Sequence, residues 1–287
     1  MALREATLDD LQSLRELFAA ANDTPYDLAA VAEEKCFEPG PSGPARTLVA
    51  ESGGELTGAV TFTPRGVRLI AVRRSRRRGG IGSALLEEAE RTIRSGRLEV
   101  FAEAGNYFIP GVPSEGRAML AFFMARGYEP ESGLAENLEV ELQSNPSIPK
   151  QWGRGISRAS AVESDDIAAF ITARFGALWA FEAARAMRND PPTVFVARGR
   201  SGEIGGFAAY EAVNVGLGFF GPMGVAESLR GRGLGRRLLL ASLRDLRRMG
   251  HARAVISWTA NAAFYTSVCG ARPSLHMIRL RRSIVRG

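Results

Sequence analysis

Cysteine and long hydrophobic runs are both scarce in this sequence of 287 residues. Its two cysteines, Cys36 and Cys269, lie far apart and show no metal-ligand spacing, so we predict neither a disulfide framework nor a metal site. No apolar run approaches the roughly 20 residues that span a bilayer, and no apolar signal-peptide core follows the opening residues MALRE. We therefore expect a cytoplasmic protein with no membrane partner.

Lysine is equally rare, since Lys35 and Lys150 are the only two, yet the formal net charge is +6. Almost all of the positive charge is arginine, and GC-rich codon usage is one explanation for the scattered arginines. It does not explain the five arginines of the run 73–78, RRSRRR. Such a charge favours an anionic partner, which could be a polymer or a small molecule.

The chain contains one sequence pattern twice. The first copy, VRRSRRRGGIGSALLEEAERTIRSG, begins at Val72, and the second, VAESLRGRGLGRRLLLASLRDLRRMG, begins at Val225. Each copy has a Val, an Arg five positions later, two glycines in a G-x-G arrangement, and then a leucine-rich run typical of a helix. Arg230 follows Arg77 by 153 positions, and flanking segments repeat at a similar spacing. An internal repeat of this kind predicts two copies of one structural unit.

The repeat divides the chain into an N-terminal domain at 1–143, a proline-containing linker at 144–155, and a C-terminal domain at 156–287. A composition of 45% hydrophobic and 24% charged residues is typical of a globular protein. Alternating or wholly apolar runs joined by glycine-containing turns predict strands. The predicted strands are 47–50, 57–62, 67–72, 98–101, 194–197, 204–210, 216–225, 254–258 and 275–280. Because helical patterns lie between them, we predict an α/β (α+β) fold in which helices flank a mixed sheet.

The segment 230–235, RGRGLG, has the composition of a phosphate-binding loop. Its glycines can bring several backbone N–H groups onto one concave face, and the helix that follows adds the positive end of its dipole. The arginines in and after this loop can donate further hydrogen bonds to phosphate oxygens. Neither copy has the Lys of a Walker A loop, and Leu85 and Leu238 replace the third glycine of the dinucleotide pattern. A different kind of phosphate cradle is therefore expected.

The pattern V-x(4)-R-x-x-G-x-G, between a strand and a long helix, resembles the acetyl-CoA signature of the GNAT-type N-acetyltransferases. The resemblance covers essentially the whole chain and implies two tandem GNAT-like domains, each with a mostly antiparallel, twisted sheet. It implies that the backbone of Met223 and Val225 binds the pantetheine arm, as Ile70 and Val72 would in the first copy. Pro222 cannot donate to a strand ladder, which fits a strand that separates from its neighbour.

The same resemblance implies the remaining coenzyme contacts. The residues implied in this way are Arg77, Arg78, Gly79, Gly80, Ile81, Gly82, Arg230, Gly231, Arg232, Gly233, Leu234, Gly235, Arg236 and Asn261.

A possible acid distinguishes the two copies. Family members that use a side-chain acid place a Tyr on the helix after the fifth strand, and the resemblance assigns this role to Tyr265. The first copy has Phe123 at the matching place, so we expect it either to bind coenzyme without turnover or to be purely structural. A general base is harder to assign, because Glu211 and His276 are the only candidates near the second copy's strands and either could be structural.

The resemblance implies transfer of an acetyl group from acetyl-CoA to the primary amine of a small molecule or peptide, with no nucleic-acid partner. One alternative is a non-catalytic acyl-CoA sensor, and another is a nucleic-acid-binding protein that uses the basic run. The acceptor pocket would come from 11–35 and 165–188, which do not identify the acceptor. The insertion 103–116 could cover a site or join the domains, and the aromatic residues at 179–181 could line a pocket or the core.

Overall fold

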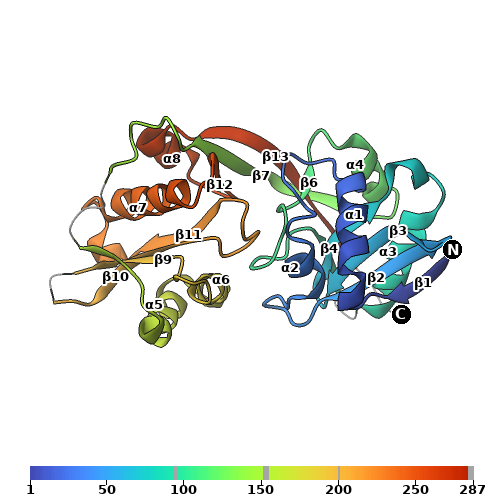
Figure 1. The fold of residues 1–287 in the computed structure, drawn as a ribbon, viewed down its shortest axis with the longest axis horizontal. Coiled ribbons are helices and arrows are strands. Elements are labelled where there is room, and N and C mark those ends of the chain that lie inside the picture. The colour runs from blue at the N-terminus through green and yellow to red at the C-terminus, as the bar shows by residue number, and fades with distance from the viewer. Residues whose placement is uncertain (94–95, 151–154, 200, 284–287) are drawn as a thin grey trace. The chain divides into compact units, whose positions relative to one another are not determined.

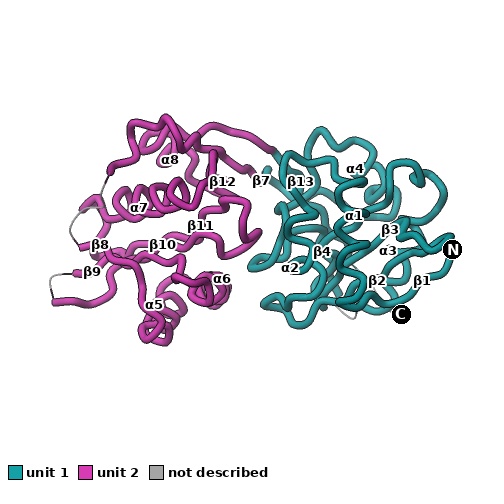
Figure 2. The backbone as a smooth tube through the Cα atoms, viewed as in Figure 1, with its two compact units in different colours: residues 1–135, 276–287 teal, residues 136–275 magenta. Residues whose placement is uncertain are grey.

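The computed structural model describes residues 1–93, 96–150, 155–199 and 201–283 (Figure 1). Part of the predicted linker, 151–154, lies outside the described residues. The chain forms two compact units, coloured separately in Figure 2. Unit 1 consists of 1–135 and 276–287, and unit 2 consists of 136–275. The end of the first repeat therefore belongs to unit 2, and the end of the second repeat belongs to unit 1.

Both units alternate strands with helices. Unit 1 contains β1 (Ala2–Glu5), α1 (Leu11–Ala21), α2 (Ala32–Phe37), β2 (Arg46–Ser52), β3 (Glu55–Thr63), β4 (Gly66–Val72), α3 (Ile81–Thr92), β5 (Arg97–Val100), β6 (Val112–Pro113) and α4 (Arg117–Met124). Unit 2 contains β8 (Ile156–Arg158), α5 (Ser164–Phe175), α6 (Ala177–Met187), β9 (Val194–Arg198), β10 (Ile204–Tyr210), β11 (Phe219–Val225), α7 (Leu234–Arg248), β12 (Arg253–Ile256) and α8 (Ala262–Cys269). Two long strands, β7 (Glu129–Glu141) and β13 (Arg272–Ser283), pass from one unit into the other.

The two sheets have the same strand order. In unit 1 the order is β1-β2-β3-β4-β5-β13, and in unit 2 it is β8-β9-β10-β11-β12-β7. Only the β4–β5 and β11–β12 pairs are parallel in these two series. The predicted fold class, a mixed and mostly antiparallel sheet flanked by helices, is confirmed. The last strand of each sheet is supplied by the other sequence repeat.

Alternating residues of the unit 2 strands build two apolar layers, as the two-residue period of a strand requires. In β9, Phe195 and Ala197 pack in the layer that contains the leucines of α7. Their neighbours Val194 and Val196 pack in the layer formed with α5 and α6. Figure 1 shows α7 on one face of this sheet and α5 and α6 on the other. In unit 1, α3 forms the corresponding layer with β2 to β5.

The expected strand 216–225 was too long at its start. β11 begins at Phe219, because Gly216 and Gly218 have positive φ angles of 89° and 75° and form a turn. The buried carboxylate of Glu211 accepts hydrogen bonds from the N–H groups of both glycines. Similarly, β12 ends at Ile256 instead of continuing to 258.

Candidate coenzyme and acyl-transfer site

The loop between β11 and α7 presents a row of free backbone amides. Arg230 N–H bonds to Glu227 O, and the next bond formed by this segment joins Arg237 N–H to Gly233 O. Between them, the N–H groups of residues 231–236 have no acceptor within the described part of the chain. Gly231 and Gly233 adopt left-handed conformations with φ of 76° and 73°, which glycine accepts without steric cost.

This row of amides, the 231–236 cradle, faces open space. No described heavy atom lies within 4 Å of the position that a Cβ would take on Gly231 or Gly233. The cradle also lies at the N-terminus of the 15-residue helix α7, where the helix dipole favours an anion. Arg232 and Arg236 are exposed beside it. These features fit the diphosphate of a coenzyme, which needs several donors and little steric obstruction.

The corresponding loop of unit 1 has a similar backbone, but two arginines of its basic run bind groups within unit 1. Gly80 has φ of 83° and precedes α3, and the N–H groups of residues 78–83 have no acceptor among the described residues. However, the Arg77 guanidinium donates to Ala21 O at 2.7 Å and lies 2.7 Å from an Asp23 carboxylate oxygen. Arg74 also pairs with Asp23, at 2.8 Å.

The pKa of Asp23 reflects these contacts. Burial would raise the pKa of this carboxyl, but hydrogen bonds from Arg74 and Arg77 hold it below its ordinary value. Part of the basic run, including the predicted coenzyme contact Arg77, is therefore neutralised within unit 1.

β11 contains a bulge where it separates from β12. Tyr210 of β10 pairs with Phe220, but Ala208 pairs with Met223, so one extra residue lies on β11 between these pairs. Gly221 in this bulge has φ of 128°, and no described atom lies within 4 Å of its Cβ position. The parallel pairing with β12 ends at Phe220 and Ile256. Bulges of this kind commonly redirect a strand next to a functional site.

Unit 1 has a bulge at the same place, but there the gap is closed. Phe62 pairs with Val67 and Thr61 pairs with Leu69, so Arg68 is the extra residue. Its Nε donates to Glu103 Oε2 at 2.7 Å, and both side chains are buried. This ion pair, the 68–103 bridge, joins β4 to the segment after β5, just past the last β4–β5 pair of Val67 and Val100.

A backbone hydrogen bond extends the closure. Phe101 N–H donates to Val67 O at 2.7 Å in unit 1. In the described part of unit 2, the corresponding Ser257 N–H forms no bond to Phe220 O. The parallel strands of unit 2 thus separate earlier than those of unit 1, and no described atom lies within 4 Å of the Cβ position of Gly221.

Tyr265 lies on α8, beside Phe220, the residue that precedes the bulge. Its ring meets Phe220 edge-on at a centroid distance of 6.2 Å and contacts Phe264 at 5.1 Å. The Phe264 ring in turn lies 3.7 Å from the Cβ position of Gly235, in the first turn of α7. α8 therefore places Tyr265 in the same unit as the bulge and the 231–236 cradle.

Burial raises the pKa of Tyr265 to about 12, against a smaller lowering by a hydrogen bond with Thr259. The phenol therefore holds its proton at neutral pH. Thr259 Oγ1 also accepts the Asn261 N–H at 3.1 Å, which fixes the start of α8.

Phe123 takes the place of Tyr265 in unit 1. The Phe122 ring lies 3.5 Å from the Cβ position of Gly82, as Phe264 lies against Gly235. Phe122 and Phe123 meet at 5.1 Å and 78°, and Phe264 and Tyr265 meet at 5.1 Å and 77°. Unit 1 therefore has an apolar ring in the position where unit 2 has a phenol.

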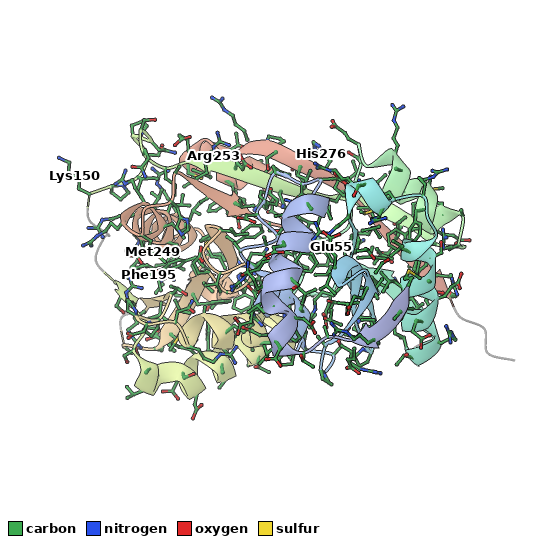
Figure 3. The ribbon with its side chains drawn as sticks, turned by 45° about the vertical axis from the view of Figure 1, so that its right-hand side comes forward. Glu55, Lys150, Phe195, Met249, Arg253 and His276 are labelled. Atoms are coloured by element: carbon green, nitrogen blue, oxygen red, sulfur yellow. The ribbon has the colours of Figure 1, made fainter. Side chains whose placement is uncertain are left out.

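The structure assigns a structural contact to Glu211, one of the two candidate bases. Both carboxylate oxygens of Glu211 accept backbone N–H bonds, and His251 lies 3.4 Å from one of them. Glu211 is therefore a structural residue that holds the turn before β11. His276, labelled in Figure 3, belongs to the part of β13 in unit 1, whereas Tyr265 belongs to unit 2.

The aromatic cluster at 179–181 and the insertion 103–116 both contact the strands of their own units. Trp179 stacks on Phe175 at 5.5 Å, and Phe175 covers the backbone of Gly224 in β11. Trp179 is nevertheless 38% exposed, so this cluster has both a core side and a solvent side. The insertion 103–116 contributes Glu103 to the 68–103 bridge and contains the short strand β6. Sequence reasoning did not identify Arg68, Glu103 or Thr259.

The GNAT acetyltransferase family model matches residues 11–107 and 156–271, and the chain belongs to this family. The two matched regions define a tandem GNAT protein, an acyltransferase class. The comparison with curated proteins found no match to this chain. Every described helix is too short or too polar to cross a membrane. In the described ranges, no group of three or more His, Cys, Asp or Glu side chains is arranged to hold a metal ion.

Several solved structures share this fold. The GCN5-related glucosamine N-acetyltransferase region of a fungal multi-domain GH3 β-N-acetylglucosaminidase is 18% identical with a TM-score of 0.78; the match covers 98% of this chain and 38% of that one. A GCN5-related N-acetyltransferase from Sphaerobacter thermophilus is 18% identical with a TM-score of 0.70, over 100% and 96% of the two chains. A tandem GNAT protein from the clavulanic acid biosynthesis pathway is 17% identical with a TM-score of 0.70, over 100% of both.

Proposed function

We propose that this protein transfers an acetyl group from acetyl-CoA to a primary amine, and that unit 2 carries out the transfer. The observation that carries this proposal is that one unit combines the 231–236 cradle, the open bulge at Gly221 and a protonated Tyr265. When bound, acetyl-CoA supplies the acetyl group as a thioester. In this proposal the coenzyme contacts of unit 2 are those that the resemblance implies, namely Met223, Val225, the residues 230–236 and Asn261.

In this proposal, separate parts of unit 2 bind the diphosphate, hold the pantetheine arm and donate a proton. The 231–236 cradle binds the diphosphate, because its free amides and the helix dipole compensate negative charge. The bulge leaves room for the pantetheine arm beside the backbone of Met223 and Val225. Tyr265 Oη keeps a proton that it can donate to the sulfur as the carbon–sulfur bond breaks, and solvent then restores that proton. The amine loses its own proton to water.

Unit 1 is proposed as a non-catalytic copy. Phe123 has no proton to donate, and the 68–103 bridge fills the gap that stays open in unit 2. These two observations favour a structural role over a second transfer site. The amides of Gly79, Gly80, Ile81 and Gly82 could still bind an anion, since they face outwards as their counterparts do.

The test is thiol release from acetyl-CoA in the presence of an amine panel of glucosamine, a lysine-containing peptide and a polyamine. Glucosamine is included because one structurally similar protein is described as a glucosamine N-acetyltransferase region. Tyr265→Phe should lower kcat by about 100-fold, the scale of a lost general acid, while the KM for acetyl-CoA stays the same. The matched control is Tyr128→Phe, which removes a hydroxyl bonded to Glu90 in unit 1 and should leave kcat unchanged. Unchanged turnover in Tyr265→Phe would remove this residue from the mechanism.

A further inference from the structure

The turn between β12 and α8 is held by a strand that comes from the first sequence repeat. β7 runs antiparallel to β12 in unit 2, and Ile256 pairs with Leu138 at the end of this ladder. Beyond that pair the backbone of β12 turns away, and Trp258 adopts a positive φ of 50°. Thr259 N–H then donates to Glu136 O at 3.3 Å. The turn therefore contacts β7 at a point where the regular strand ladder has already ended.

Asn137 replaces the missing ladder contact with its side chain. Its Oδ1 accepts a hydrogen bond from Ser257 Oγ at 2.8 Å and another from Trp258 N–H at 3.2 Å. Asn137 is fully buried, so no water could take over these bonds without a rearrangement. An apolar residue here would leave Trp258 N–H and Ser257 O–H without this acceptor, and a buried unsatisfied donor is costly.

The same turn leads directly to Tyr265. Thr259, the residue after Trp258, accepts the Asn261 N–H at 3.1 Å, and Asn261 O accepts the Phe264 N–H at 3.1 Å in the first turn of α8. The hydrogen bonds of Asn137 and of the turn therefore hold the start of the helix that carries Tyr265. Small displacements of a catalytic group have large effects on rate, because the reacting atoms must meet in one geometry.

We propose that Asn137, a residue of the first repeat, positions the Tyr265 hydroxyl for proton transfer. This inference rests on the proposed acid role of Tyr265. Asn137 touches neither substrate nor coenzyme in this proposal and acts only through the 257–261 turn. The first repeat has Phe123 where the second repeat has Tyr265. In this proposal the first repeat nevertheless supplies Asn137 to unit 2, where Asn137 positions Tyr265.

The first readout is independent of the acceptor. The protein contains five tyrosines, so 3-fluorotyrosine labelling followed by fluorine NMR gives a small set of signals, and Tyr265→Phe identifies the signal of Tyr265. Asn137→Ala should shift or broaden that signal. The matched control Asn189→Ala removes another amide of unit 2, which donates to Thr193 Oγ1 at 2.7 Å, and should leave the Tyr265 signal in place.

The second readout is a double-mutant cycle on thiol release from acetyl-CoA, with an amine of the panel or with water as acceptor. Asn137→Ala alone should lower kcat by roughly 10- to 100-fold, as expected for a displaced catalytic group. In the Tyr265→Phe background it should lower kcat by less than about two-fold, because the group that it positions is already gone. A purely structural residue would instead give the same loss in both backgrounds.

The outcomes separate the two proposals. If Tyr265→Phe lowers kcat, and Asn137→Ala lowers kcat by the same factor in that background as in the unmodified protein, Asn137 does not act through Tyr265. An unmoved Tyr265 signal in Asn137→Ala overturns the inference in the same way. If Tyr265→Phe turns over like the unmodified protein, the proposed acid fails, whatever Asn137 does. Should Asn137→Ala not fold, Ser257→Ala removes one of the two bonds and should give a smaller change of the same kind.

Discussion

Two equivalent glycines offer a sharp test of the 231–236 cradle. Gly233 and Gly80 each precede the first residue of a helix, with φ of 73° and 83°. Neither has a described atom within 4 Å of its Cβ position, so alanine introduces no clash at either site. The only common cost is the left-handed backbone conformation of a residue with a Cβ, which is about 1 kcal/mol. We expect Gly233→Ala and Gly80→Ala to lower Tm by a similar amount, about 3 °C.

Their functional effects should differ. The methyl group of Gly233→Ala projects into the space proposed for the diphosphate and would weaken at least one charge-assisted hydrogen bond. A loss of about 2 kcal/mol corresponds to a KM for acetyl-CoA that is about 30-fold higher. Gly80→Ala should leave that KM unchanged, because it alters the loop of unit 1.

The assays are thermal unfolding and the dependence of thiol release on acetyl-CoA concentration. A Gly233→Ala variant that is destabilised like Gly80→Ala, but keeps the original KM, would show that the diphosphate is not bound at this helix. Equal increases in KM for both variants would contradict the assignment of turnover to unit 2.

Three further outcomes can be measured. Leu280→Ala should destabilise unit 1 by about 3 kcal/mol, because Leu280 is buried in its core although it belongs to the second repeat; hydrogen exchange should increase in unit 1 peptides. A hydrogen bond from Arg4 lowers the pKa of Asp10 to about 2, so this pair should stabilise the protein above about pH 4 and lose that effect as the pH falls towards 2. In Asp10→Asn, the free energy of unfolding measured with urea should depend less on pH between about 4 and 2. Glu103→Gln should cost about 3 kcal/mol by leaving Arg68 buried without its counter-ion, whereas thiol release should persist.

The parts of the site that the sequence could predict are local. Glycine supplies the positive φ angle before the helix in both loops, at Gly80 and Gly233, although Arg78 takes the left-handed conformation that Gly231 has in unit 2. The similarity of the segments that begin at Ala121 and Ala262 also placed Phe123 and Tyr265 at equivalent positions, and the contacts of Phe122 and Phe264 with Gly82 and Gly235 agree with that alignment.

The contacts that the sequence could not predict join residues that are distant along the chain. Arg68 and Glu103 are 35 positions apart, and Asn137 and Ser257 are 120 positions apart. Such pairs depend on the register of packed strands, and no short motif encodes them. Charge clustering was equally incomplete as a guide, because it did not show that Asp23 neutralises Arg74 and Arg77.

The exchanged strands affect what proteolysis can do to this protein. A protease that cuts the connection at 144–155 would leave one fragment carrying β7 and another carrying β13, and each fragment would still hold a strand of the other's sheet. The nicked chain would therefore remain a single particle until both β7 and β13 are released from their sheets. Separating the two halves of the gene would likewise not yield two autonomous enzymes, since neither half encodes a complete sheet.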